Sequence, residues 1–326
     1  LEQSLGRTAF ELGLYERGEA LMTRALGTFA EIGSTEGQIG TRADLAGLYL
    51  FGGDWERAEA EVERALDEGR RELGPDHREV LRALSVRGMI YTEAMQFDEA
   101  LTLYGELMQQ AEAAHGSDSE EYLTAREGRA YALLQLERMD EAEAEYQELI
   151  PRARELFGND SPVTMRFIHS AGLCYVRMER FEEGLAHYLE SLEMGRRVQG
   201  SDHTETHVSL INLARLYVTL GRFAEAETHV REALDIAERT MPPTSFAMAM
   251  SHAVLGDALQ GQERYEEAEP FFIHAYGLFT DLMGPQSGGS LIMAQNIVKG
   301  RTSRGAAGAD LEMWKERGVQ VEDPAP

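Results

Sequence analysis

The sequence repeats itself every 42 residues, and this period constrains the fold more than any other feature. A bulky residue recurs one period apart in six places: Trp55, Phe97, Met139, Phe181, Phe223 and Tyr265. Tyr15 stands 40 residues before Trp55 and completes a set of seven. Nine residues before and three residues after each bulky position, the chain holds only glycine or alanine. A fixed period of this size is typical of stacked supersecondary units, so we expect seven repeats.

Each repeat is predicted to form two helices that cross at small residues. In the first helix a small residue precedes a tyrosine by three positions, as at Ala46 and Tyr49 or Ala214 and Tyr217, so both lie on one helix face. In the second helix, apolar residues recur at spacings of three and four. Small side chains let two helix axes approach closely. The sequence therefore predicts an all-α chain of paired helices.

A short turn motif separates the repeats. It has glycine first and aspartate third, as in residues 74–77 (Gly-Pro-Asp-His) and 158–161 (Gly-Asn-Asp-Ser). Glycine suits the left-handed residue just after a helix end. Aspartate is predicted to be the N-cap of the next helix, with a glutamate three residues later as its capping-box partner, as in Asp76 and Glu79.

These motifs resemble the tetratricopeptide repeat family in its 42-residue, kinesin-light-chain-like form. The resemblance extends from Leu1 to about Gly284 and is most specific in residues 73–77, 213–227 and 265–271. It implies an all-α, right-handed superhelical solenoid of seven helix pairs plus a C-terminal capping helix, expected from Ser290 to Arg301. Residues 1–303 are expected to form this solenoid, and residues 304–326 a flexible C-terminal tail with a short helix.

Composition excludes several classes of partner. The chain has 31 basic and 57 acidic residues, a net charge of −26, which disfavours a surface for nucleic acid. It has one cysteine, Cys174, and no run of 18 apolar residues, so neither an internal disulfide nor a membrane partner is predicted. We expect a cytoplasmic protein. Only two of the basic residues are lysines, which hints at a GC-rich bacterial source, and the start without methionine hints at a piece of a longer chain.

The sequence contains no recognisable catalytic motif. A phosphate-binding glycine loop, a serine elbow and an HExxH motif are all missing, so we predict no enzyme and no cofactor. Cys174 lies in an apolar stripe and is interpreted as a buried thiol. His203 and His207 have a spacing that could hold a metal, but a third ligand is missing, so polar residues at a helix start are the preferred interpretation.

The first helices are expected to line the concave surface of the stack. The resemblance implies that groove residues lie 15, 12, 8, 5 and 4 positions before each bulky residue. Chosen from the fifth and sixth repeats, with a neighbouring asparagine, the predicted peptide-binding groove is Arg166, His169, Arg177, Ile211, Asn212, Arg215, Val218 and Thr219. Its three arginines suit carboxylates, so we expect a protein or peptide partner that is acidic with an apolar anchor. The alternative is that these arginines pair with glutamates on adjacent helices and only solubilise the groove.

Two functions remain open. The first is a non-enzymatic protein–protein interaction module or scaffold that binds a peptide segment in its concave groove. The second is a sensor or regulatory arm of a larger bacterial signalling protein whose catalytic domain lies outside this chain. The tail from Asp310 to Gly318, which carries Trp314, is expected to dock into a groove of its own chain or a neighbouring one, which would allow self-association. The alternative is a flexible tail whose tryptophan has no docking role.

Overall fold

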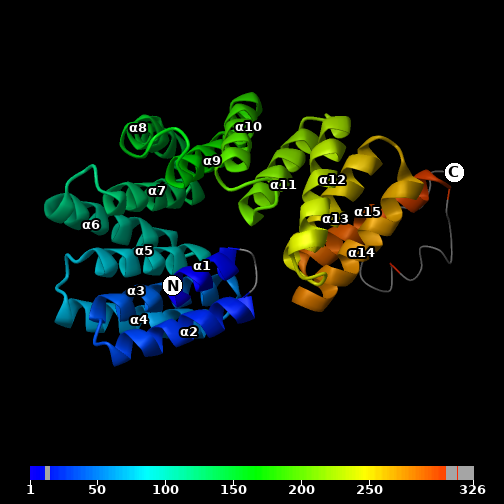
Figure 1. Ribbon diagram of the computed structural model, residues 1–326. Coiled ribbons are helices and arrows are strands. Elements are labelled where there is room, and N and C mark those ends of the chain that lie inside the picture. The colour runs from blue at the N-terminus through cyan, green and yellow to red at the C-terminus, as the bar shows by residue number, and fades with distance from the viewer. Residues whose placement is uncertain (12–14, 306–313, 315–326) are drawn as a thin grey trace. The chain divides into compact units, whose positions relative to one another are not determined.

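The computed structural model describes residues 1–11, 15–305 and Trp314 (Figure 1). These residues form helices and connecting turns, without a strand. The helices are α1 (Glu2–Glu11), α2 (Tyr15–Glu31), α3 (Thr35–Phe51), α4 (Trp55–Glu72), α5 (Arg78–Glu93), α6 (Phe97–His115), α7 (Glu120–Gln135), α8 (Met139–Phe157), α9 (Pro162–Arg177), α10 (Phe181–Val198), α11 (Thr204–Thr219), α12 (Phe223–Thr240), α13 (Phe246–Gly261), α14 (Tyr265–Met283) and α15 (Gly288–Ser303). The predicted seven pairs and closing helix are confirmed.

The chain forms two compact units, which we describe separately. Unit 1 is Leu1–Met194 and unit 2 is Gly195–Pro326, so the boundary falls inside α10. The predicted division into a solenoid of residues 1–303 and a flexible tail of residues 304–326 stays a prediction, because residues 306–313 and 315–326 lie outside the described residues. The short helix predicted from Asp310 to Gly318 falls there too, apart from Trp314.

In each unit the first helices of successive repeats form one layer. In unit 1, α3 packs against α5, α5 against α7 and α7 against α9; in unit 2, α11 packs against α13 and α13 against α15 (Figure 1). The second helices, such as α4, α6 and α12, pack mainly against the first helices on either side. Helices that touch their counterparts in the next repeat lie on the inner side of a curved stack, so the first helices line the concave face.

The turns between repeats confirm one prediction and correct another. Gly74, Gly158 and Gly200 have φ of 93°, 89° and 95°, which glycine adopts without strain. The N-caps, however, are the residues after the predicted aspartates. His77 accepts from the backbone N–H of Glu79 at 3.3 Å, and six serine or histidine residues cap the equivalent helices: Ser34, Ser119, Ser161, His203, Ser245 and Ser287.

The prediction that the aspartates are N-caps was wrong. The turn is one residue longer than a capping box that starts at the aspartate would require, so the next residue occupies the N-cap position. Two of the aspartates instead pair with arginines on the second helix of the repeat that follows the turn, Asp118 with Arg152 of α8 and Asp202 with Arg239 of α12. The glutamates expected as capping partners stand two residues after the true cap rather than three. A capping box therefore does not form at these starts.

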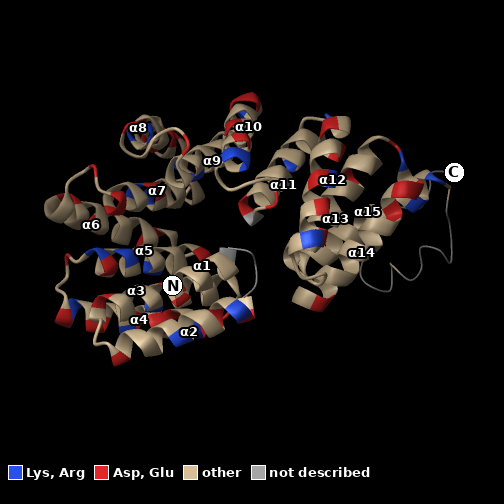
Figure 2. Cartoon of the chain, in the orientation of Figure 1, with Lys and Arg blue, Asp and Glu red and all other residues tan. Residues whose placement is uncertain are grey.

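Charged residues of both signs are spread along the helices rather than gathered in one patch. Figure 2 shows acidic and basic residues interspersed along the helices of both units. Many arginines form ion pairs with glutamates, some within one helix and others across neighbouring helices, as Arg42 does with Glu61 at 2.8 Å. Among the described helices, none has both the length and the apolar character needed to cross a lipid bilayer.

Candidate functional site

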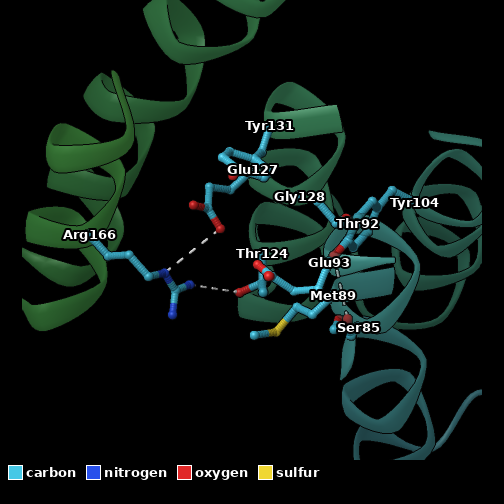
Figure 3. A pocket seen from close by; sticks show the side chains of 10 residues that line it. All are labelled: Ser85, Met89, Thr92, Glu93, Tyr104, Thr124, Glu127, Gly128, Tyr131 and Arg166. Atoms are coloured by element: carbon cyan, nitrogen blue, oxygen red, sulfur yellow. Dashed lines mark hydrogen bonds and ion pairs between the residues drawn. The ribbon is translucent and has the colours of Figure 1, made fainter. Parts of the chain in front are cut away.

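The concave face of unit 1 contains a cavity of about 250 Å³ between α5, α7 and α9. Figure 3 shows its lining: Ser85, Met89, Thr92, Glu93, Tyr104, Thr124, Glu127, Gly128, Tyr131 and Arg166. All but Tyr104 come from first helices. Repeats three to five thus each contribute to one hollow on the inner layer.

Tyr104 reaches the floor of this cavity from the second helix α6 because two glycines make room for its ring. A Cβ atom built on Gly88 or on Gly128 would lie 2.4 Å from the ring carbon Cζ of Tyr104, so no larger residue fits at either position without displacing the ring. The Tyr104 hydroxyl donates to the backbone carbonyl of Ser85 at 3.5 Å. The side chain is buried, which raises the pKa of Tyr104 and keeps its hydroxyl protonated.

The rim of the cavity carries both signs of charge (Figure 3). Arg166 Nη2 donates to Thr124 Oγ1 at 3.4 Å, and Arg166 Nε lies 3.9 Å from Glu127 Oε2. Glu127 also accepts from the hydroxyl of Ser170 at 2.8 Å. These contacts to Arg166 are long and its side chain is 48% exposed, so its guanidinium is only loosely held.

The other two predicted residues of unit 1 differ in character. The His169 ring lies 5.0 Å from that of Tyr188, and burial lowers the pKa of His169 to about 4, so its imidazole is neutral at pH 7. Arg177 is exposed and makes no ion pair with the described residues. Burial, followed by the charge of Glu93, raises the pKa of Tyr131, whereas Arg177 opposes this shift. The charge of Arg177 therefore acts at the cavity wall.

The remaining predicted residues lie on α11 of unit 2. Ile211 is buried, whereas Asn212 and Val218 are partly buried. Arg215 and Thr219 are exposed, and the Thr219 hydroxyl donates to the carbonyl oxygen of Arg215 at 3.1 Å. Because these residues belong to the other unit, convergence of all three arginines on one pocket stays a prediction.

Arg215 faces an acidic residue of the next first helix. On α13, Asp257 Oδ1 accepts a hydrogen bond from Asn296 Nδ2 of α15 at 2.8 Å. Burial raises the pKa of Asp257 to about 6, and the nearby charges of Arg215 and Lys299 together with the Asn296 hydrogen bond oppose this rise. Unit 2 thus has a charged concave face in which a carboxyl group stands between two cations.

Comparison with known sequences and structures identifies the family. A tetratricopeptide repeat model matches residues 79–155 and 163–239, and a second model of the same description matches residues 39–79, so more than half of the chain is covered. The chain belongs to the tetratricopeptide repeat family. No curated protein sequence matches this repeat protein significantly.

Several solved repeat structures share the fold at low sequence identity. BtubC (BKLC) from P. vanneervenii is 20% identical with a TM-score of 0.60, covering 72% of this chain and 94% of that chain. A Podosopora anserina putative kinesin light chain with nearly identical repeats is 17% identical with a TM-score of 0.54, covering 64% and 97%. A signal transduction ATPase with numerous domains and a tetratricopeptide repeat sensor, from Pyrococcus horikoshii, is 12% identical with a TM-score of 0.67, covering 97% of this chain and 46% of that chain.

The two histidines considered for metal binding have separate structural roles in this repeat protein. His203 caps α11, accepting from the backbone N–H of Glu205 at 3.2 Å. His207 is buried, and its Nε2 lies 2.9 Å from Ser251 Oγ on α13. Within the described residues, no group of three histidine, cysteine or acidic side chains is placed to hold a metal ion. Cys174 is buried, and burial raises the pKa of its thiol to about 11.

The predicted site and the observed cavity share only Arg166. Met89, Glu93, Thr124, Glu127 and Tyr131 all occupy groove positions of the repeat pattern, but the prediction favoured the arginine-bearing fifth and sixth repeats. Tyr104 was missed because second helices were not expected to reach the groove. The available signal was the pair of glycines, 88 and 128, at inward positions of two consecutive first helices.

Proposed function

We propose that this repeat protein is a non-enzymatic interaction module that binds a peptide segment on its concave face, with acidic side chains and an apolar anchor in the peptide. The unit 1 cavity carries this proposal. Its volume of about 250 Å³ accommodates a side chain of leucine or phenylalanine size, and Met89 and Tyr131 offer apolar walls for it. Within unit 1 the first-helix layer continues from α5 to α3 and α1, which offers an extended peptide a longer surface.

The acidic preference rests on arginines that have no strong ion-pair partner among the described residues. Arg177 and Arg215 are exposed and without an ion pair among the described residues, and Arg166 holds Glu127 only at 3.9 Å. A carboxylate bound by such a guanidinium in a partly desolvated groove contributes about 1.5 to 3 kcal/mol. Glu93 and Glu127 work against this preference in unit 1, so Arg177 is expected to carry most of it there.

The test compares two labelled peptides that share a central leucine, one flanked by glutamates and the other by lysines. Arg177→Glu should weaken the glutamate peptide by about tenfold and leave the helical circular dichroism unchanged. Arg70→Glu, which changes the same charge at an exposed residue of the second helix α4, is the control and should have little effect.

The possible outcomes test the acidic preference, the groove and the anchor cavity separately. Equal binding of the two peptides to the parent would remove the acidic preference, and binding of neither would remove the groove as a peptide site. Replacing the central leucine by alanine should weaken the glutamate peptide in the parent. If this replacement leaves the affinity unchanged, the cavity does not bind an apolar anchor side chain of the peptide.

A second candidate function is that of a sensor or regulatory arm. Its support is the match of 97% of this chain to less than half of a signal transduction ATPase that carries a repeat sensor. Reading the continuous coding frame around this sequence tests it. A nucleotide-binding domain in the same frame would support the sensor arm, and start and stop codons directly at both ends would contradict it.

We further propose a reducing, cytoplasmic location and a docked tail. The location is supported by the single cysteine, which is buried. Tail docking is supported by Trp314, which is 3% exposed with its ring edge-on to Tyr276 of α14 at 5.1 Å. This contact favours docking within one chain over self-association. Light scattering should then show the same molar mass for the parent and for Trp314→Ala across concentrations, whereas tail-mediated self-association would show a larger mass in the parent alone.

A further inference from the structure

Three charged residues of unit 2 occupy the same position in three consecutive first helices. Arg215 on α11, Asp257 on α13 and Lys299 on α15 are spaced by 42 residues each. Because α11 packs against α13 and α13 against α15, this spacing aligns them across the concave face. The order along the row is cation, carboxyl, cation.

The middle member differs from the outer two in its surroundings. Arg215 and Lys299 are exposed, whereas Asp257 is partly buried and accepts from Asn296 at 2.8 Å. The groups acting on the Asp257 carboxyl come from α11 and α15, namely Arg215, Asn296 and Lys299. Among the described residues, no charged group of α12 or α14 is part of this set. The His252 ring of the same helix lies against that of His274, with 4.2 Å between ring centres and 43° between ring planes.

We propose that Asp257 is a built-in counter-carboxylate that competes with acidic side chains of the partner for Arg215 and Lys299, and so sets the affinity of unit 2 for that partner. This inference rests on the proposed function and names the device that regulates it. An ionised Asp257 neutralises part of the cationic charge and repels an incoming carboxylate. A neutral residue at the same position leaves both cations to the partner.

Protonation of the Asp257 carboxyl near pH 6 ends its competition with the partner for the two cations. Burial raises the pKa of Asp257 to about 6, so its carboxyl is ionised at pH 7.5 and mostly neutral at pH 5.5. Glutamate side chains of an exposed peptide, with a pKa of about 4.3, stay ionised at both values. Affinity for an acidic peptide should therefore rise as the pH falls from 7.5 to 5.5.

The experiment measures binding of the labelled glutamate peptide with its central leucine to the Arg177→Glu variant of the whole chain, in which the main arginine contact proposed for unit 1 is removed. In that background, Asp257→Asn should tighten binding by about fivefold to tenfold at pH 7.5 and abolish the gain on acidification. Asp281→Asn removes one acidic charge at an exposed residue of α14 and should change affinity by less than about twofold. Adding Arg215→Gln and Lys299→Gln to Asp257→Asn should reverse the gain.

The outcomes separate this inference from the proposed function. If Asp257→Asn and its background bind the peptide equally at both pH values, the counter-carboxylate is rejected while peptide binding stands. If the peptide binds none of the proteins, the parent included, both are rejected. If Asp257→Asn does not fold, a second comparison still tests the inference. The peptide affinity of the protein that keeps Asp257 should rise as the pH falls, whereas that of the Arg215→Gln, Lys299→Gln variant should not.

Discussion

Units 1 and 2 use the same repeat frame to present different chemistry on their concave faces. Seven residues after the bulky position, the third to fifth repeats have Tyr104, Tyr146 and Tyr188, whereas unit 2 has Val230 and Phe272. In unit 1 a tyrosine hydroxyl therefore reaches the floor of a cavity, with carboxylates and an arginine at its rim. In unit 2 these second-helix positions are apolar, and the polar groups described on the concave face, such as Asp257 and Asn296, belong to first helices.

This difference shows which parts of the repeat are fixed by packing. The small residues at the helix crossings recur in both units because the close approach of two helices admits nothing larger. Inward positions away from the crossings face space that a side chain, solvent or a ligand can fill. Those positions vary freely, so recognition can differ from one end of the chain to the other without a change of fold.

Lowering the pH should destabilise unit 2 more than unit 1, and this is the largest difference expected between them. Burial lowers the pKa of His207 and of His252 to about 4, both in unit 2, whereas unit 1 has His169 with a similar shift. Such a neutral histidine contributes stability that is complete above pH 6.5 and is lost as the pH falls toward 4, at most about 3 kcal/mol for His207. His207→Leu should therefore flatten the pH dependence of unit 2 between these values.

The two tryptophans make this measurable because each unit holds one, Trp55 and Trp314. Single-tryptophan proteins, unfolded in urea at pH 7 and pH 5, report each unit by fluorescence. Equal loss of stability at both tryptophans would contradict the expected contrast. His203→Leu is the control, since His203 is a partly exposed helix cap and not a core residue.

A smaller effect is expected where glycine makes room for Tyr104. Gly128→Ala places a methyl group 2.4 Å from the ring and should destabilise unit 1 by about 1 to 3 kcal/mol, while also reducing binding of the leucine-centred peptide. Gly105→Ala, where nothing lies within 4 Å of the added atom, should instead stabilise unit 1 by about 0.5 to 1 kcal/mol. Urea unfolding followed at Trp55 distinguishes the two, and a neutral Gly128→Ala would show that the ring is not confined there.

The smallest effect concerns a feature that the units share. Ser119→Ala in unit 1 and Ser245→Ala in unit 2 each remove a helix N-cap and should each cost about 1 kcal/mol. Asp118→Asn, at the residue that the sequence suggested as the cap, should cost less, because its ion pair with Arg152 is exposed to solvent and contributes little. A larger loss for Asp118→Asn than for Ser119→Ala would return the capping role to the aspartate.

The sequence predicted the architecture because its signals are local and repeated. Helix pairs, the small crossing residues and the glycine that follows most second helices are encoded by spacings within one repeat. Because the pattern recurs in seven copies, an exception such as the turn after α12 does not obscure it. The cap position shows the limit of this approach. Two polar residues, such as Asp118 and Ser119, are adjacent in the turn, and only the backbone path selects which one accepts the helix N–H.

The candidate site was less predictable because its contacts join residues of different repeats. The sequence alone determined the 42-residue repeat pattern of the family, the positions that face inward and the excess of acidic charge. The tertiary structure decided that Tyr104 emerges between Gly88 and Gly128, that Arg166 rests near Glu127, and that Asp257 binds Asn296. These partners lie roughly 15 to 40 residues apart in the chain. The angle between stacked helices and the rotamers of long side chains bring them together, and a repeat period encodes neither.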